Sequence, residues 1–205
     1  RNAMSTASRV RTAGLIGMAG GMLWIVSVIL QNSQGLFDPD GSPAWMLQQV
    51  LALAGMLCSM AGFLGLLWGQ AFRGRLGPLG IILHIVGWGL IFIGGLALLV
   101  IGPAESPLFL VFPIGGNLHD IGYILIGIAT IISGRWSGWQ RWMPLVAAMV
   151  NILTMGLPML LGAATDGPGM IAELLNGVMW LGIGLAAFSA SRQAAPAPAP
   201  ASRAV

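Results

Sequence analysis

The stretch RGRLGPLGIILHIVGWGLIFIGGLALLVI, residues 73–101, places two arginines directly before a long apolar run. From Pro78 to Ile101 the only titratable side chain is that of His84. A helix needs about 20 predominantly apolar residues to cross the hydrocarbon core of a bilayer. This stretch therefore predicts a membrane-spanning helix that begins beside positive charges.

Six runs of this kind occur along the chain. They cover residues 13–32, 46–69, 78–101, 115–133, 143–163 and 170–190. The composition agrees, because the 205 residues are 57% hydrophobic and 7% charged, whereas soluble domains carry about 25% charged residues. We therefore expect an all-α, polytopic membrane protein, a bundle of six transmembrane helices embedded in the lipid bilayer. The scattered basic residues form no face for nucleic acid, and we expect no such partner.

The arginines orient the predicted bundle. All nine positive charges are arginines, and they fall in four segments: the N-terminus, residues 70–77, residues 134–142 and the C-terminal tail. All six acids lie in the alternate connections or at the helix ends beside them. Because cytoplasmic loops concentrate positive charge, both termini are predicted to be cytoplasmic. We expect the protein in a bacterial inner membrane.

Three domains follow from this pattern. Residues 1–12 form a cytoplasmic N-terminal segment, and we expect the three residues before Met4 to be a cloning remnant. Residues 13–190 form the transmembrane domain. Residues 191–205 are rich in alanine and proline, which predicts a disordered tail.

Equivalent positions recur before and within the odd-numbered spans. Arg11, Arg75 and Arg141 precede spans one, three and five, and Trp24 and Trp88 each follow their arginine by thirteen residues. This spacing favours three antiparallel helical hairpins arising from an internal repeat. The alternative is that any apolar hairpin followed by arginine produces a similar pattern.

Small residues and one proline predict local features of the helices. Gly17 and Gly21 form a small-xxx-small pair, which allows close helix packing inside the bundle. Pro158 lacks an amide hydrogen, and we expect it to distort the fifth helix near Thr154.

Two polar residues lie deep in the predicted spans. His84 and Asn151 fall at similar depths in the third and fifth helices, where they are expected to face each other and form a hydrogen bond. The contact is either a structural link between two helices or part of a ligand or proton pathway, since polar groups within membranes are costly and often functional.

A second polar group gathers at the ends of the spans that lie opposite the arginines. Its candidate ligand-binding members are Gln48, Asn117, His119, Asp120, Glu173 and Asn176. Two interpretations remain open: helix capping at the interface, favoured by acids near helix N-termini, or a shallow polar pocket. His119 and Asp120 are not expected to pair, because neighbouring residues of a helix point about 100° apart.

No cofactor or metal is predicted. His84 and His119 are expected to lie roughly 15–20 Å apart along the membrane normal, which would prevent them from sharing one haem. A haem held by His84 or His119 alone remains open. Two histidines and a remote cysteine are a poor ligand set for zinc. No catalytic residue is assigned, because no hydrolase, protease or phosphate-loop motif is present.

The chain resembles a loose group of uncharacterised six-helix membrane proteins of GC-rich bacteria. The resemblance is carried by RTAGLIGMAGGMLW at 11–24, WGQAFRGRLGPLG at 68–80 and RWSGWQRWMPL at 135–145. It implies the topology and no activity.

Two functions are compatible with these patterns. The first is binding or transport of a small or lipophilic solute by the polar residues. The second is a non-catalytic accessory or assembly role among other membrane subunits, and a haem-binding or enzymatic role ranks below both. A continuous polar cavity that joins Glu173, Asp120 and Asn151 would favour transport, whereas a dry, fully packed bundle would contradict it.

Overall fold

The computed structural model describes residues 6–35, 41–69, 71–101, 111–160 and 169–193. These residues form six helical segments and no strand, which confirms the all-α prediction. Five segments are long and apolar enough to cross a membrane, as in a multi-pass membrane protein. They are α1 (Thr6–Gln34), α2 (Pro43–Trp68), α3 (Leu76–Ile101), α4 (Val111–Ser133) and α7 (Met170–Gln193).

The remaining segment consists of three pieces that follow one another without a break. α5 (Met143–Asn151) continues into a π-helix (Ile152–Gly156) and then into α6 (Leu157–Leu160). A short 3-10 helix, Gly138–Arg141, precedes α5. Met143–Gly156 of this segment is an apolar helix that is shorter than the other five. The tail beyond Gln193 lies outside the described residues.

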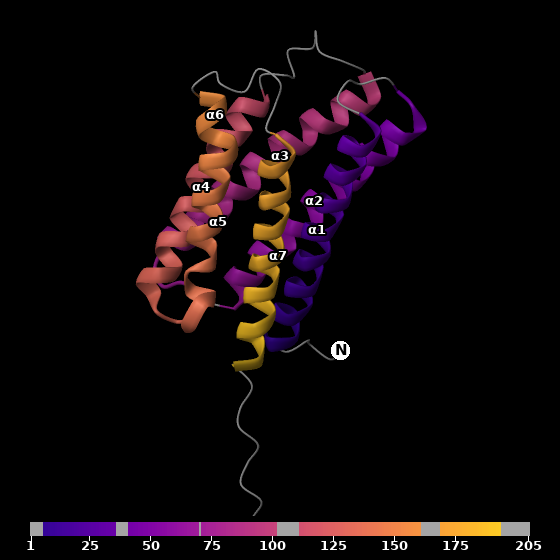
Figure 1. Ribbon diagram of the computed structural model, residues 1–205. Coiled ribbons are helices and arrows are strands. Elements are labelled where there is room, and N and C mark those ends of the chain that lie inside the picture. Colours follow the sequence, from indigo (N-terminus) through magenta and orange to yellow (C-terminus); the bar gives the residue numbers. More distant parts are fainter. Residues whose placement is uncertain (1–5, 36–40, 70, 102–110, 161–168, 194–205) are drawn as a thin grey trace, which may run out of the picture.

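The elements run alongside one another between two chemically different ends (Figure 1). α1 packs against α2 and α7, α3 packs mainly against α4, and α5 packs against α4 and α7. One end, at the bottom of Figure 1, holds the start of α1, the α2–α3 and α4–α5 connections and the end of α7. All the arginines that the structure describes lie in or beside these segments, and we call this the arginine end: Arg9, Arg11, Arg73, Arg75, Arg135, Arg141 and Arg192. The opposite end holds the beginnings of α2, α4 and α7.

In each of α3 and α4, glycines recur every seven residues where the two helices touch: Gly80, Gly87 and Gly94 in α3, and Gly115 and Gly122 in α4. A Cβ atom added at Gly87 would lie 2.4 Å from the backbone nitrogen of His119, and one added at Gly122 would lie 2.5 Å from that of His84. Such contacts leave no room for any side chain at these positions. A seven-residue spacing keeps the same stripe facing its partner when two helices cross at a small left-handed angle. The glycines therefore set both the distance and the register of α3 and α4.

Glycines also bring α1 into close backbone contact with two neighbouring helices, α2 and α7. A Cβ atom at Gly17 would lie 2.7 Å from the Cα of Gly62 in α2, and one at Gly21 would lie 2.7 Å from the carbonyl oxygen of Gly177 in α7. The predicted pair Gly17 and Gly21 thus packs inside the protein. Gly17 lies closest to α2 but also contacts Gly184 of α7, whereas Gly21 packs against α7.

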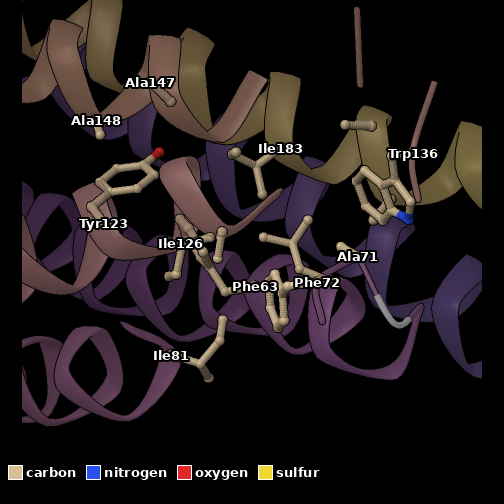
Figure 2. Packing of buried hydrophobic residues seen from close by; sticks show 14 of the residues in the cluster. Phe63, Ala71, Phe72, Ile81, Tyr123, Ile126, Trp136, Ala147, Ala148 and Ile183 are labelled. Atoms are coloured by element: carbon tan, nitrogen blue, oxygen red, sulfur yellow. The ribbon is translucent and has the colours of Figure 1, made fainter. Parts of the chain in front are cut away.

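A packed apolar core fills the half of the molecule nearer the arginines (Figure 2). Phe63 of α2, Ile126 of α4 and Ile183 of α7 are almost completely buried there. Ala147 and Ala148 bring α5 into the same cluster. These side chains pack against one another between the helices in the arginine half of the described structure.

The distortion predicted near Thr154 takes the form of the π-helix. The N–H of Leu157 donates to the carbonyl oxygen of Ile152, five residues earlier. The next residue, Pro158, has no N–H, and its ring would clash with the carbonyl of Thr154 in a regular helix. One wide turn accommodates the proline.

Matched substitutions test the glycine contact. Gly87→Ala should lower the free energy of unfolding in detergent by about 1–3 kcal/mol, because its methyl group would overlap the α4 backbone. Gly89→Ala, two residues away, should leave stability unchanged or raised by up to about 1 kcal/mol, because nothing lies within 4 Å of its added Cβ. Equilibrium unfolding followed by circular dichroism measures both. Equal effects of the two changes would refute the proposed close contact.

Candidate functional site

A cavity of about 430 Å³ lies above the packed core, between the ends of the helices that are distant from the arginines. Every helical segment contributes to its wall. Most of the lining is apolar, including Trp24, Trp88, Phe112, Met56 and Met155. Five of the eight candidate residues line it: Asn117, His119, Asp120, Asn151 and Asn176.

A smaller cavity of about 180 Å³ adjoins the first. The two share Trp24, Met56, Ile91 and Phe112 as walls. Gln48 and Glu173, two further candidates, line only the smaller cavity. There the amide nitrogen of Gln48 donates to Gln31 Oε1 over 3.1 Å. The polar group predicted from the sequence is therefore divided between two neighbouring spaces.

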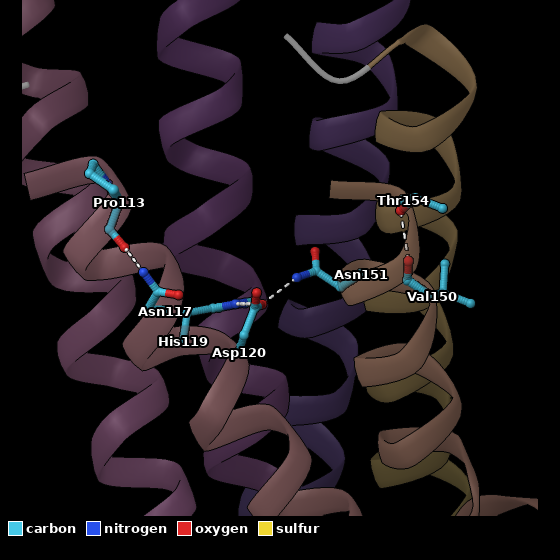
Figure 3. Close-up of polar contacts among 7 residues, drawn as sticks. All are labelled: Pro113, Asn117, His119, Asp120, Val150, Asn151 and Thr154. Atoms are coloured by element: carbon cyan, nitrogen blue, oxygen red, sulfur yellow. Dashed lines mark hydrogen bonds and ion pairs between the residues drawn. The ribbon is translucent and has the colours of Figure 1, made fainter. Parts of the chain in front are cut away.

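Asp120 is the centre of the polar contacts in the larger cavity (Figure 3). Its Oδ1 accepts a hydrogen bond from Asn151 Nδ2 over 2.6 Å and lies 2.9 Å from His119 Nδ1. Its side chain remains 21% exposed, whereas that of His119 is 5% exposed. The carboxylate thus links α4 to the end of α5 while facing open space.

The expectation that His119 and Asp120 would not pair is wrong. The directions of their Cβ atoms do diverge along the helix. However, Nδ1 is only two bonds from the Cβ of His119, and the short carboxylate can rotate toward it. The two polar groups therefore meet beside the backbone of α4.

The predicted hydrogen bond between His84 and Asn151 is also wrong. Among the described residues α3 makes no contact with α5, because α4 lies between them. Asn151 reaches Asp120 of α4 instead. Neither ring nitrogen of the fully buried His84 has a hydrogen-bond partner in the described part of the chain.

The large predicted separation of His84 and His119 is wrong as well. Their ring centroids are 4.5 Å apart, and the ring planes differ by 32°. Gly122, which contacts the backbone of His84, is only three residues from His119. The two histidines therefore differ by about 4.5 Å along the helix axes. The separation of the two histidines along the helix axes therefore does not exclude a ligand that contacts both of them.

The capping interpretation does not hold for Asp120. α4 begins at Val111, four residues before the predicted span. Asp120 therefore lies about 14 Å from the start of its helix, beyond the first turn in which a helix dipole acts. Glu173 does lie in the first turn of α7, where capping remains a sufficient explanation.

Aromatic rings form the wall between the cavity and the core. The ring of Trp88 lies 4.7 Å from that of His119 and 5.0 Å from that of Trp180, in both cases edge to face. The indole N–H of Trp24 donates to the backbone carbonyl of Glu173 over 3.0 Å, which connects α1 to the start of α7. The sequence identified Trp24 and Trp88 only as equivalent positions of a repeat. Their shared spacing from arginine indicated the shared depth that places both in this wall.

Gly156 was not predicted as part of the site. A Cβ atom at this position would lie 2.7 Å from Asp120 Oδ2. The last residue of the π-helix must therefore be small for the carboxylate to occupy its place. No sequence pattern pointed to this contact, because it joins residues of α4 and the π-helix that only the fold brings together.

The described residues hold no group of three or more histidine, cysteine, aspartate or glutamate side chains that could bind a metal ion. The chain matches no protein-family model, no curated protein and no solved structure.

A double-mutant cycle tests the link between α4 and α5. Asp120→Ala and Asn151→Ala should be non-additive by roughly 1–2 kcal/mol in unfolding free energy, because either change removes the same charge-assisted hydrogen bond. Asn117→Ala provides the matched control. Its amide nitrogen donates to the Pro113 carbonyl and not to Asp120, so its effect should add to that of Asp120→Ala. Additivity in both cycles would contradict the link.

Proposed function

We propose that this chain crosses a bacterial inner membrane six times and binds a small, largely apolar solute in the larger cavity, as a step in its transport. The arginines would lie in the cytoplasm with both termini. The cavity would then open toward the outer side of the membrane.

The sixth crossing in this proposal is the segment from Met143 to Leu160. Its 18 residues would extend about 27 Å if fully helical, close to the thickness of the hydrocarbon core. It begins beside Arg141 at the arginine end and runs alongside α4 to the opposite end in Figure 1. A single helix that stopped halfway would leave backbone groups unsatisfied in lipid.

The observation that carries the binding proposal is the cavity with Asp120 in its wall. Small-molecule sites have volumes of about 300–1,000 Å³, mostly apolar walls and a few convergent polar groups. This cavity has those properties at about 430 Å³. An ionisable residue inside a membrane span is costly, which favours a functional role over a purely structural one.

The packed core on the arginine side of the cavity supports the proposal that solute binding is a step in transport. The aromatic wall around His119 and the core below it separate the cavity from the arginine end. Transporters place their sites between two gates that open in turn. On this proposal the structure represents the form whose cytoplasmic gate is closed.

Filling the cavity tests the proposal. Gly116 lines the cavity, and an added Cβ would meet no atom within 4 Å. Gly116→Phe should therefore fold normally and abolish ligand binding, measured by native mass spectrometry from mild detergent and by ligand-induced shifts in melting temperature. Gly89→Phe adds the same ring to α3, also at a position with open space. It lies outside both cavities and should leave binding unchanged.

Two outcomes would overturn the binding role. One is a wild-type protein that retains no small molecule and responds to none in a broad screen. The other is a protein that is recovered only with fixed partner subunits and whose assembly Gly116→Phe does not affect. The second result would establish the accessory role instead.

A further inference from the structure

We propose that the solute is a lipophilic organic cation, an alkyl or aryl ammonium whose charged end binds Asp120. This inference rests on the proposed function and specifies its substrate class. It follows from the charge in the cavity, from the polar atoms left without partners there, and from the nature of the walls.

Among the described residues, the carboxylate of Asp120 faces the cavity with no lysine or arginine beside it, and its partner His119 is positively charged only when protonated. The chain has no lysine, and no arginine is among the residues that line either cavity. Both hydrogen-bond contacts of Asp120 use Oδ1. Its Oδ2 lies beside Gly156, which also lines the cavity, and we infer that this oxygen contacts the ligand.

Apart from the indole N–H of Trp88, which has no partner among the described residues, the other polar groups of the cavity offer acceptors. Asn117 and Asn151 line the cavity and direct their amide nitrogens to the Pro113 carbonyl and to Asp120. We infer that their amide oxygens face a ligand. Asn176 lines the cavity, is only 2% exposed, and its Oδ1 has no partner among the described residues. Unmet acceptors in a buried site are costly. An ammonium group carries the N–H donors that would satisfy them.

The walls suit the apolar part and the charge of such a ligand. The rings of Trp24, Trp88 and Phe112 line the cavity together with Met56 and Met155. Aromatic faces attract cations, with tryptophan the strongest, and the attraction grows when water is excluded. Methionine side chains adapt to apolar groups of varied shape. A neutral or anionic solute would gain from the walls but not from Asp120.

Four probes of similar size and different charge test the inference on the purified full chain. They are phenylbutylammonium, phenylbutyl-trimethylammonium, phenylbutanol and phenylbutyrate, with binding measured by isothermal calorimetry in detergent. Phenylbutylammonium should bind at least about tenfold more tightly than phenylbutanol, and phenylbutyrate should bind most weakly. The trimethylammonium probe keeps the charge without N–H donors and should rank between phenylbutylammonium and phenylbutanol.

Two isosteric substitutions assign the preference to a residue. Asp120→Asn should remove the advantage of phenylbutylammonium over phenylbutanol while leaving phenylbutanol binding within about twofold. Glu173→Gln, an equal change in the adjoining cavity, should preserve that advantage. Circular dichroism and retained phenylbutanol binding confirm that both variants fold.

The outcomes separate this inference from the proposed function. Equal binding of all four probes, or preference for phenylbutyrate, would overturn the cation assignment and leave the binding function standing. Loss of preference in Glu173→Gln but not in Asp120→Asn would overturn the role of Asp120. Binding of none of the probes, together with a negative broad screen, would overturn both the inference and the function.

Discussion

Backbone contact between α3 and α4 is the constraint on which the site depends. Where Gly87 meets His119 and Gly122 meets His84, no side chain separates the two helices. Lipid offers no hydrophobic driving force for helix association, so close backbone packing supplies much of the attraction. The same contact fixes the register that stacks the two histidines and positions Asp120 toward α5.

The position of Asp120 illustrates how a membrane protein accommodates a costly group. A carboxylate at this depth would be unfavourable in lipid. Here it accepts a hydrogen bond from Asn151 and occupies the space that Gly156 leaves. The π-helix, required by Pro158, brings Gly156 to that place. A backbone irregularity and a small residue therefore combine to hold a charged group beside a cavity.

The sequence predicted the helices of the fold better than it predicted the contacts between them. Long apolar runs showed the helices, because crossing a bilayer demands length and hydropathy of each one separately. The predicted contact between His84 and Asn151 was wrong because it depends on which helices are neighbours. Neither the depth of a residue in its span nor the repeat spacing determines which helices are neighbours. The predicted depth of His119 was wrong because α4 begins at Val111, four residues before the predicted span. The glycine repeat at positions 80, 87 and 94 carried the missing register. The seven-residue spacing of these glycines could have predicted which face of the third helix packs closely against a neighbour.

On the proposed function, the cavity beside Asp120 opens on the side of the membrane opposite the arginines. The most direct test of this claim is the reactivity of Asn117→Cys, an exposed position of the cavity wall, in a chain whose single cysteine is removed by Cys58→Ser. A membrane-impermeant maleimide should label it in spheroplasts but not in inverted vesicles, and phenylbutylammonium should slow the labelling. Labelling only in inverted vesicles, or from neither side, would contradict the claim.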